Sequence, residues 1–260
     1  MIKFLKRNIK NYLEKLLGLD KYLSKQNQIK LLLGNILEKN NNLTDINKAE
    51  FKVFSQFGED GIIDFIIKNI SLKNKVFLEI GTENYEEANT RFLLENGHWS
   101  GLIIDGEKEH INYIKKQDYY WKYDLNVINN FVTIENINNL IENYKNYKNI
   151  SLLSIDIDGN DYWLWKEINI DPAIVVIEYN SRYGKDRSVT IPYKSDFTRP
   201  KFGKKKIYYG ASLQALNKLG NSKGYSLVAT NVAGNNAFFV KKNCLSKVLK
   251  EQSVNDCYTE

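Results

Sequence analysis

Apolar residues fall in short, nearly unbroken runs, and the segments between the runs have the spacing of amphipathic helices. The run Val76–Ile80 is interrupted only by Glu79 and is followed at once by Gly81. After a segment with helical spacing, a second run, Gly101–Ile104, ends on Asp105. Near-continuous apolar runs are typical of parallel strands that are buried on both faces. The pattern therefore predicts a strand, a glycine turn, a helix and a second strand.

The same alternation continues along the chain and predicts an α/β fold with a doubly wound, mostly parallel, seven-stranded sheet. Further strands are expected at Ser151–Ile157, Ala173–Ile177, Tyr225–Thr230 and Ala237–Lys241, and one more in the later part of the segment 120–133. Helices are expected at Ala88–Glu95, Lys108–Lys116, Glu135–Tyr144, Tyr162–Ile168 and Ala211–Lys223, with another that begins near Gly61 and is capped by Ser55 or Asp60. The last two strands form an antiparallel hairpin that closes the sheet.

The beginning of the chain differs from the rest, and we expect residues 1–50 to be a basic helical arm with its linker and residues 51–260 to be one α/β domain. Apolar residues at helical spacing predict one helix before Gly18 and a second through Ile29–Glu38. Residues 1–42 contain nine Lys or Arg and three acids, so they carry the whole net charge of +6. The remainder is neutral, which argues against nucleic acid as a partner.

Three interpretations of the arm stay open from the sequence. The arm packs on its own domain with its lysines in water, pairs with another subunit in a homo-oligomer, or makes peripheral contact with a membrane surface. The first two are favoured over the third. Because no apolar run approaches the length of a membrane span, and Cys244 and Cys257 form no C-x-x-C pair, a cytoplasmic protein with reduced thiols is expected.

The glycine pattern at the first turn indicates which ligand the sheet would bind. Gly81 stands alone, whereas a turn that binds a pyrophosphate needs several glycines with exposed backbone N–H groups. Glu83, Glu86 and Glu87 follow, and they would repel phosphates. They suit an adenosine ligand without phosphates, such as S-adenosylmethionine, whose sulfonium is positive. The alternative is an ordinary strand, turn and helix that binds no ligand.

Polar side chains also follow the two later parallel strands. Asp156 and Asp158 follow one apolar run, and Glu178 and Asn180 follow the next. Parallel neighbours bring their carboxyl ends to one edge of the sheet, and close carboxylates there repel one another unless a cation joins them. Asp156, Asp158 and Glu178 are therefore candidate ligands of Mg²⁺ or a similar cation. Asp156 and Glu178 are also the candidate catalytic carboxylates, and Asn180 is a candidate acceptor contact.

Other interpretations of these residues stay open. Asp158, Gly159 and Asn160 would form a turn, with Asp161 as the cap of the next helix. The D-x-D spacing of Asp156 and Asp158 also fits a metal-dependent glycosyltransferase, and a non-catalytic module that kept the fold is a third possibility. His98 and His110 are interpreted as surface residues.

Residues 181–209 have neither helical nor strand periodicity and contain a basic cluster of Arg199, Lys201, Lys204, Lys205 and Lys206. A long irregular insert after a strand is usually functional. We expect it to lie over the sheet edge and bind an acidic or phosphorylated acceptor, although a solvated lysine loop fits equally well. Lys204 and Lys205, together with Asn235 in the hairpin turn, are the candidate contacts.

From about Phe54 to Lys242 the chain resembles class I S-adenosylmethionine-dependent methyltransferases of the FkbM-like family, found in bacterial polysaccharide and polyketide biosynthesis. The resemblance is carried by SQFGEDG, FLEIGTENYEEANTRFLLENGHWSGLIIDGE, LLSIDIDGNDYWLW, VVIEYN and YYGASLQALNKLGNSKGYSLVATNVAGNNAFFVKK. It implies an O-methyltransferase that acts on a hydroxyl of a sugar or related metabolite. The first motif departs from the family's E-x-G-x-G-x-G, because Glu83 and Tyr85 replace the later glycines.

By similarity, Glu79 and Gly81 form the first cofactor motif, Asp105 is the ribose-binding acid, and Asn89 and Gln56 lie near the methionine portion. The expected cofactor site is Gln56, Glu79, Gly81, Thr82, Asn89, Asp105, Gly106, Asn130, Phe131 and Asp156, with Asn130 and Phe131 as the adenine contacts. The partner would be a small-molecule or glycan acceptor.

Overall fold

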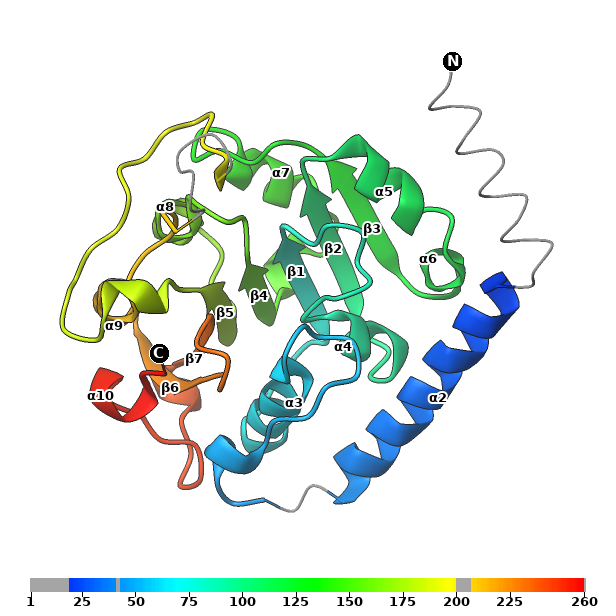
Figure 1. Ribbon diagram of the computed structural model, residues 1–260, viewed down its shortest axis with the longest axis horizontal. Coiled ribbons are helices and arrows are strands. Elements are labelled where there is room, and N and C mark those ends of the chain that lie inside the picture. The colour runs from blue at the N-terminus through cyan, green and yellow to red at the C-terminus, as the bar shows by residue number, and fades with distance from the viewer. Residues whose placement is uncertain (1–18, 41–42, 200–206, 260) are drawn as a thin grey trace.

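The computed structural model describes residues 19–40, 43–199 and 207–259. Its centre is a seven-stranded sheet with the strand order β3-β2-β1-β4-β5-β7-β6 (Figure 1). β7 is antiparallel to both neighbours, and the other pairs are parallel. The strands are β1 Val76–Ile80, β2 Ser100–Asp105, β3 Leu125–Asn129, β4 Leu152–Ile155, β5 Ile174–Glu178, β6 Tyr225–Thr230 and β7 Asn236–Lys241. The predicted sheet with its C-terminal hairpin is confirmed, and this strand order is that of the class I methyltransferase fold.

Helices cover both faces of the sheet (Figure 1). They include α2 Leu19–Asn40, α3 Glu59–Asn69, α4 Arg91–Glu95, α5 Lys108–Ile114, α6 Asp118–Lys122, α7 Ile137–Glu142, α8 Asp161–Glu167, α9 Leu213–Ser222 and α10 Val254–Cys257. Among the described residues the second arm helix is longer than predicted, since it covers Leu19–Asn40 and not only Ile29–Glu38. The first predicted arm helix lies outside the described residues. In the segment 120–133, α6 takes the beginning and β3 the middle.

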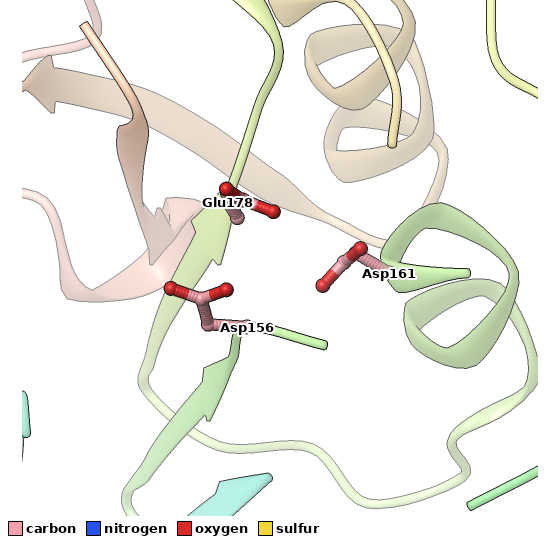
Figure 2. A group of neighbouring side chains, drawn as sticks. All are labelled: Asp156, Asp161 and Glu178. Atoms are coloured by element: carbon pink, nitrogen blue, oxygen red, sulfur yellow. The ribbon is translucent and has the colours of Figure 1, made fainter. Parts of the chain in front are cut away.

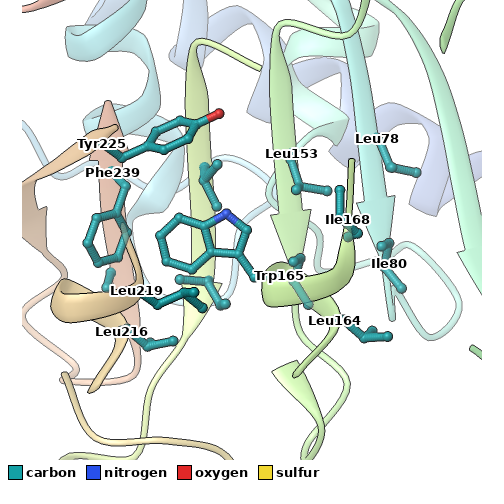
Figure 3. Packing of buried hydrophobic residues seen from close by; sticks show 14 of the residues in the cluster. Leu78, Ile80, Leu153, Leu164, Trp165, Ile168, Leu216, Leu219, Tyr225 and Phe239 are labelled. Atoms are coloured by element: carbon teal, nitrogen blue, oxygen red, sulfur yellow. The ribbon is translucent and has the colours of Figure 1, made fainter. Parts of the chain in front are cut away.

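Alternating strand residues build two hydrophobic layers, one on each face of the sheet. On one face the strands pack against α7, α8 and α9, and on the other against α3, α4, α5 and α6. Trp165 of α8 is the largest fully buried side chain, and its ring lies 4.9 Å from that of Phe239 and 5.9 Å from that of Tyr225 (Figure 3). Aromatic contacts of this kind fix α8, and with it the loop that joins β4 to α8.

The start of α3 differs from the prediction. The cap residue is Gly58, and neither Ser55 nor Asp60 caps the helix. The Asp60 carboxylate instead turns back over the preceding loop and accepts hydrogen bonds from the backbone N–H groups of Val53, Phe54 and Ser55 at 2.7–2.8 Å. The loop is therefore held by a buried acid rather than by a conventional helix cap.

The strand register places the carboxyl ends of four neighbouring strands at one edge of the sheet. Ile80 of β1 pairs with Ile104 of β2 and with Ile155 of β4, and Ile155 pairs with Ile177 of β5. The residues that directly follow these positions are Gly81, Asp105, Asp156 and Glu178. This edge is therefore where the candidate site is assembled.

Candidate functional site

A cavity of about 470 Å³ lies at this edge, within the size range of small-molecule sites. Its walls come from the ends of β1, β2, β4 and β5, from the start of β7 and from residues 197–199 of the insert. Among the described residues that line it, eight are Asp or Glu, whereas Arg199 and His110 are the ones that can be positive. A second hollow of about 510 Å³ is lined by ionisable residues that are all exposed, such as Lys185 and Glu251. The first cavity is therefore the better candidate site.

Gly81 allows the turn after β1 to lie directly against the end of β4. Its φ angle is +78°, and a Cβ atom at this position would lie 1.8 Å from the carbonyl oxygen of Asp156. The Gly81 N–H donates to the carbonyl of Ile104 on the other neighbouring strand, at 3.0 Å. Glycine is thus required here for both the backbone angle and the close approach.

Glu79 lines the cavity, but its carboxylate holds the loop between β1 and α4. One oxygen accepts from the Asn89 N–H at 2.9 Å, and the other accepts from the Thr90 N–H at 3.1 Å and from the Thr90 hydroxyl. Burial raises the pKa of Glu79 to about 7, although these hydrogen bonds act to lower it. Its main visible role is to shape the loop that carries Thr82 and Asn89.

This pKa predicts a pH-dependent contribution of Glu79 to stability. The folded protein binds the proton more tightly than the unfolded chain, whose carboxyl keeps the ordinary value of 4.5. The contribution is complete below pH 4.5 and is lost as the pH rises through 7. Relative to Glu79→Gln, we expect the free energy of unfolding of the wild type to fall by up to about 3 kcal/mol between about pH 5 and about pH 8. Urea denaturation across this pH range measures both free energies of unfolding. A difference between wild type and Glu79→Gln that does not change with pH would contradict the raised pKa of Glu79.

Asp105 is buried at the adjacent corner of the cavity with both oxygens engaged. One oxygen accepts from the N–H groups of Thr82 and Glu83 at 3.2 and 2.9 Å. The other accepts from the Glu107 N–H at 2.8 Å and lies 3.2 Å from Nδ1 of His110, so this histidine belongs to the cavity wall and not simply to the surface. A carboxylate offers about four lone-pair positions. Three accept the backbone N–H groups and the fourth faces His110, so a ribose hydroxyl would have to replace the contact with His110.

The remaining predicted cofactor residues divide into two groups. Gln56, Thr82, Asn89, Gly106 and Phe131 line the cavity, and Phe131 lies beside Gly106 with 47% of its surface exposed. Asn130 does not line it, because its side-chain oxygen accepts from Asn136 at 3.2 Å and its N–H donates to the carbonyl of Asp105. The aromatic ring is therefore better placed than the amide for contact with a ligand.

Three acids converge at the other side of the site, and two of them, Asp156 and Glu178, line the cavity. Asp156 at the end of β4, Asp161 at the start of α8 and Glu178 at the end of β5 offer oxygens that all lie within 4.8 Å of one another (Figure 2). We call these residues the acid group. Asp161 accepts from the N–H groups of Ile157 and Gly159 at 2.8 and 2.9 Å, which also fixes the loop after β4. Glu178 is buried, and its Oε2 has no hydrogen-bond partner among the described residues.

Burial and mutual repulsion disfavour the charged forms of these acids. Burial, followed by the neighbouring Asp161 and Asp158 carboxylates, raises the pKa of Asp156 well above its ordinary value. Burial and then Asp156 raise the pKa of Glu178 in the same way. Burial raises the pKa of Asp161 to about 6. The acid group is thus a place where protons or a cation would be bound strongly.

Asp158 lies outside the acid group, which differs from the predicted set of metal ligands. Its φ angle is +56°, its side chain is half exposed, and it forms an ion pair with Arg199. The turn interpretation therefore describes this residue. Asp161 belongs to the acid group instead of Asp158. It is the first residue of α8 and not its cap, because the cap residue is Asn160.

The sequence interpretation missed Asn236. Asn236 is buried, pairs with Glu178 across β7 and β5, and lines the cavity. Its Nδ2 donates to Glu59 at 3.0 Å, whereas its Oδ1 has no partner among the described residues. Burial acts to raise the pKa of Glu59, but hydrogen bonds from Gly58, Phe57 and Asn236 hold it below the ordinary value. Because ionised Glu59 can only accept hydrogen bonds, the amide oxygen of Asn236 must face the other way.

The predicted acceptor contacts are placed differently. Asn180 is buried and binds Arg182, Ile207 and Tyr209, so it fixes both ends of the insert. Asn235 bonds with Asn231 in the hairpin turn, and neither Asn180 nor Asn235 lines the cavity. Lys204 and Lys205 lie outside the described residues.

The insert reaches the cavity through residues that the prediction did not single out as acceptor contacts. Phe197, Thr198 and Arg199 line the wall. The Arg199 guanidinium lies 3.7 Å from the ring centre of Tyr209 and pairs with Asp158. Runs of lysine in the sequence drew attention to this segment, but only contacts in the folded chain show which of its side chains line the cavity.

No protein-family model and no curated protein matches the chain. Among solved structures it resembles a putative caffeoyl-CoA O-methyltransferase from Staphylococcus aureus, with 18% identity, a TM-score of 0.45, and 70% of this chain and 82% of that chain covered. It also resembles an S-adenosylmethionine-dependent methyltransferase from Clostridium acetobutylicum, with 10% identity and a TM-score of 0.44. That match covers 70% of this chain and 90% of the other. A third similar structure is an O-methyltransferase from Bacillus cereus in complex with SAH, with 13% identity and a TM-score of 0.44. That match covers 86% of this chain and 97% of the other. Similarities this low do not bear on activity, and the fold class rests on the strand order.

Proposed function

We propose that this chain is an S-adenosylmethionine-dependent O-methyltransferase that acts on a hydroxyl of a small-molecule or glycan acceptor. The main support is a cavity on a class I sheet whose wall contains Asp105, the last residue of β2, Asp156, which follows β4, and Glu178, the last residue of β5. A sugar acceptor and a cytoplasmic role in surface polysaccharide biosynthesis rest on the family resemblance and are part of the proposal.

The residues of the cavity fit this cofactor. Asp105 and Phe131 offer a carboxylate for ribose hydroxyls and an exposed ring for the adenine. The many acids of the wall would attract a positive sulfonium and would repel the diphosphate of a nucleotide ligand. Gly81 also lines the cavity, at the point where the first turn meets the end of β4.

The acid group supplies the acid–base chemistry that methyl transfer to a hydroxyl requires. When bound, S-adenosylmethionine supplies a methyl group to an acceptor oxygen aligned with it. Asp156 or Glu178 accepts the hydroxyl proton, and the raised pKa of each makes its ionised form a stronger base. Asn236 presents its amide oxygen to a second hydroxyl of the acceptor and orients it.

We further propose that the acid group holds a divalent cation such as Mg²⁺. Its three carboxylates offer oxygens within 4.8 Å of one another, and Oε2 of Glu178 has no hydrogen-bond partner among the described residues. Hard oxygen ligands favour Mg²⁺, Ca²⁺ or Mn²⁺. A cation would keep the carboxylates ionised and would hold acceptor hydroxyls beside the base.

The glycosyltransferase alternative has less support. Asp158 pairs with Arg199, so the D-x-D residues do not form one cation site. The acidic wall would also repel a nucleotide diphosphate.

We expect S-adenosylhomocysteine to bind with its ribose at Asp105. Replacing Asp105 with Ala should weaken binding by about 1.5–3 kcal/mol, because hydrogen bonds to a charged group are lost. Isothermal titration calorimetry measures the change, and Asp118→Ala, an exposed acid on α6, is the matched control. Equal affinity in the Asp105 variant and the control would refute the placement.

Turnover tests the activity itself. Methyl-labelled S-adenosylmethionine, offered with activated sugars and glycan fragments, should label one acceptor class. Tight S-adenosylhomocysteine binding with no labelled product from any acceptor would favour a non-catalytic module, and affinity for nucleotide sugars alone would favour the glycosyltransferase.

A further inference from the structure

Helix α2 exposes a continuous apolar face. The exposed fractions are 55% for Ile29, 63% for Leu32, 55% for Leu33, 54% for Ile36 and 45% for Leu37. We call these five residues the α2 stripe. At about 100° per residue they occupy one side of the helix. Large aliphatic side chains grouped in this way on a surface usually mark a binding face.

The orientation of α2 is fixed by its opposite side. A Cβ on the buried Gly34 would lie 2.7 Å from Val53 and 2.8 Å from Phe92, so the helix backbone packs closely on the domain at this point. Leu31 packs on the same small core. At the end of the helix, Glu38 accepts a hydrogen bond from Asn96 at 2.6 Å. The stripe therefore faces away from the domain, at whose periphery α2 lies (Figure 1).

The charges beside the stripe are positive. Lys25, Lys30 and Lys39 are exposed. Helical geometry places Lys39 along one edge of the stripe and Lys25 in line with its start. Lys30 lies along the other edge, with its Nζ 6.0 Å from the ring centre of Phe54 on the domain. Glu38 is turned toward the domain by its contact with Asn96. Residues 1–42 carry the whole net charge of +6, while the rest of the chain is neutral.

This positive charge favours an anionic lipid surface over a second copy of the chain as the partner of the α2 stripe. A second copy docked on the stripe would bring two arms of the same sign together, which opposes pairing. An anionic lipid surface would gain from both features, since apolar side chains enter the headgroup region while lysines reach the phosphates. No helix in the described parts of the chain is long and apolar enough to cross a membrane, so α2 would lie along the surface.

We propose that α2 binds the surface of an anionic lipid bilayer through the α2 stripe and its flanking lysines. This attachment is independent of the proposed activity, because none of the five stripe residues lines the cavity. It would keep the enzyme at a membrane while the cavity remains in water.

Cosedimentation of the full chain with lipid vesicles tests the proposal. We expect binding to phosphatidylcholine vesicles that contain phosphatidylglycerol, little binding to phosphatidylcholine alone, and weaker binding as salt rises. Leu32→Glu/Leu33→Glu should reduce the partition coefficient by about tenfold or more, because two exposed leucines that would enter the bilayer are replaced by charges. Val189→Glu/Val232→Glu, which adds equal charge at exposed valines elsewhere, should change it much less. Lys25→Gln/Lys30→Gln/Lys39→Gln should remove the preference for anionic lipid.

Several outcomes would overturn the proposal. Equal vesicle binding by the stripe variant and the valine control is one of them. Another is a dimer in light scattering without lipid that the stripe variant abolishes, which would assign the face to a second copy. Failure of the folded wild type to bind anionic vesicles, with a lower melting temperature in the stripe variant, would mean that the chain itself covers the stripe. Circular dichroism establishes folding in each case.

Discussion

Replacing Gly81 with Ala is expected to destabilise the protein by about 3 kcal/mol or more and to weaken S-adenosylhomocysteine binding at least about tenfold. A Cβ atom here would lie 1.8 Å from the carbonyl oxygen of Asp156, and backbone at the end of a central strand cannot move aside cheaply. The φ angle of +78° adds strain for any residue with a side chain. The variant must therefore separate the ends of β1 and β4, which carry the two sides of the cavity.

Gly224→Ala is the control that separates the cost of the positive φ angle from the cost of the clash with Asp156. Gly224 has a φ angle of +83°, close to that of Gly81, but a Cβ there would have nothing within 4 Å. It should cost only about 1 kcal/mol and leave ligand affinity unchanged. Urea unfolding and calorimetry measure both quantities. Equal destabilisation by the two variants would show that the backbone angle, and not the contact between β1 and β4, makes glycine necessary at position 81.

The sheet was predictable because its signal is local. Each strand is a short run of apolar residues, and most runs survive with ends shifted by a residue or two, as at Ser151–Ile157, where β4 is Leu152–Ile155. The positions of Gly81, Asp105, Asp156 and Glu178 at one edge follow from the parallel order of the strands. Residues that lie at this edge because a strand ends there could therefore be identified from the sequence.

Side-chain direction could not be predicted in the same way. Asp158 and Asp161 are both acids just after β4, and the positive φ angle of Asp158 turns it outward while α8 turns Asp161 inward. Asn235 and Asn236 are adjacent, yet only the second has its amide oriented by Glu59, a residue far away in the sequence. Choices of this kind depend on tertiary contacts that no local pattern encodes.

The length of α2 was missed for a related reason. Polar residues between Asp20 and Gln28 weaken the apolar period at its start, so the sequence favoured a helix from Ile29 onward. In the folded chain the residues from Leu19 onward are already helical. The exposure of the α2 stripe also depends on which side of the helix packs on the domain, and this is fixed by Gly34 against Val53 and Phe92.

Glu178→Gln is expected to abolish cation binding and to reduce methyl transfer by about 10²–10³-fold, since it removes a ligand and a candidate base together. Addition of Mg²⁺ or Mn²⁺ should raise the melting temperature of the wild type, because a cation relieves the repulsion among Asp156, Asp161 and Glu178. The variant should show no such rise. Without metal it should melt at or above the wild-type temperature near pH 8, since a buried carboxylate without a partner is costly there.

Asp156→Asn should behave in the same way as Glu178→Gln, whereas Asp158→Asn should keep the metal-dependent rise in melting temperature. Asp158 forms an ion pair with Arg199 outside the acid group, so the cation does not depend on it. Differential scanning calorimetry with and without each metal ion compares the three variants, and turnover in a chelator with metal then restored compares their activities. If Asp158→Asn lost the metal-dependent rise in melting temperature and Glu178→Gln kept it, the cation would have to be assigned to Asp156 and Asp158. Full turnover in the chelator would remove the cation from the reaction and leave Asp156 and Glu178 only as bases.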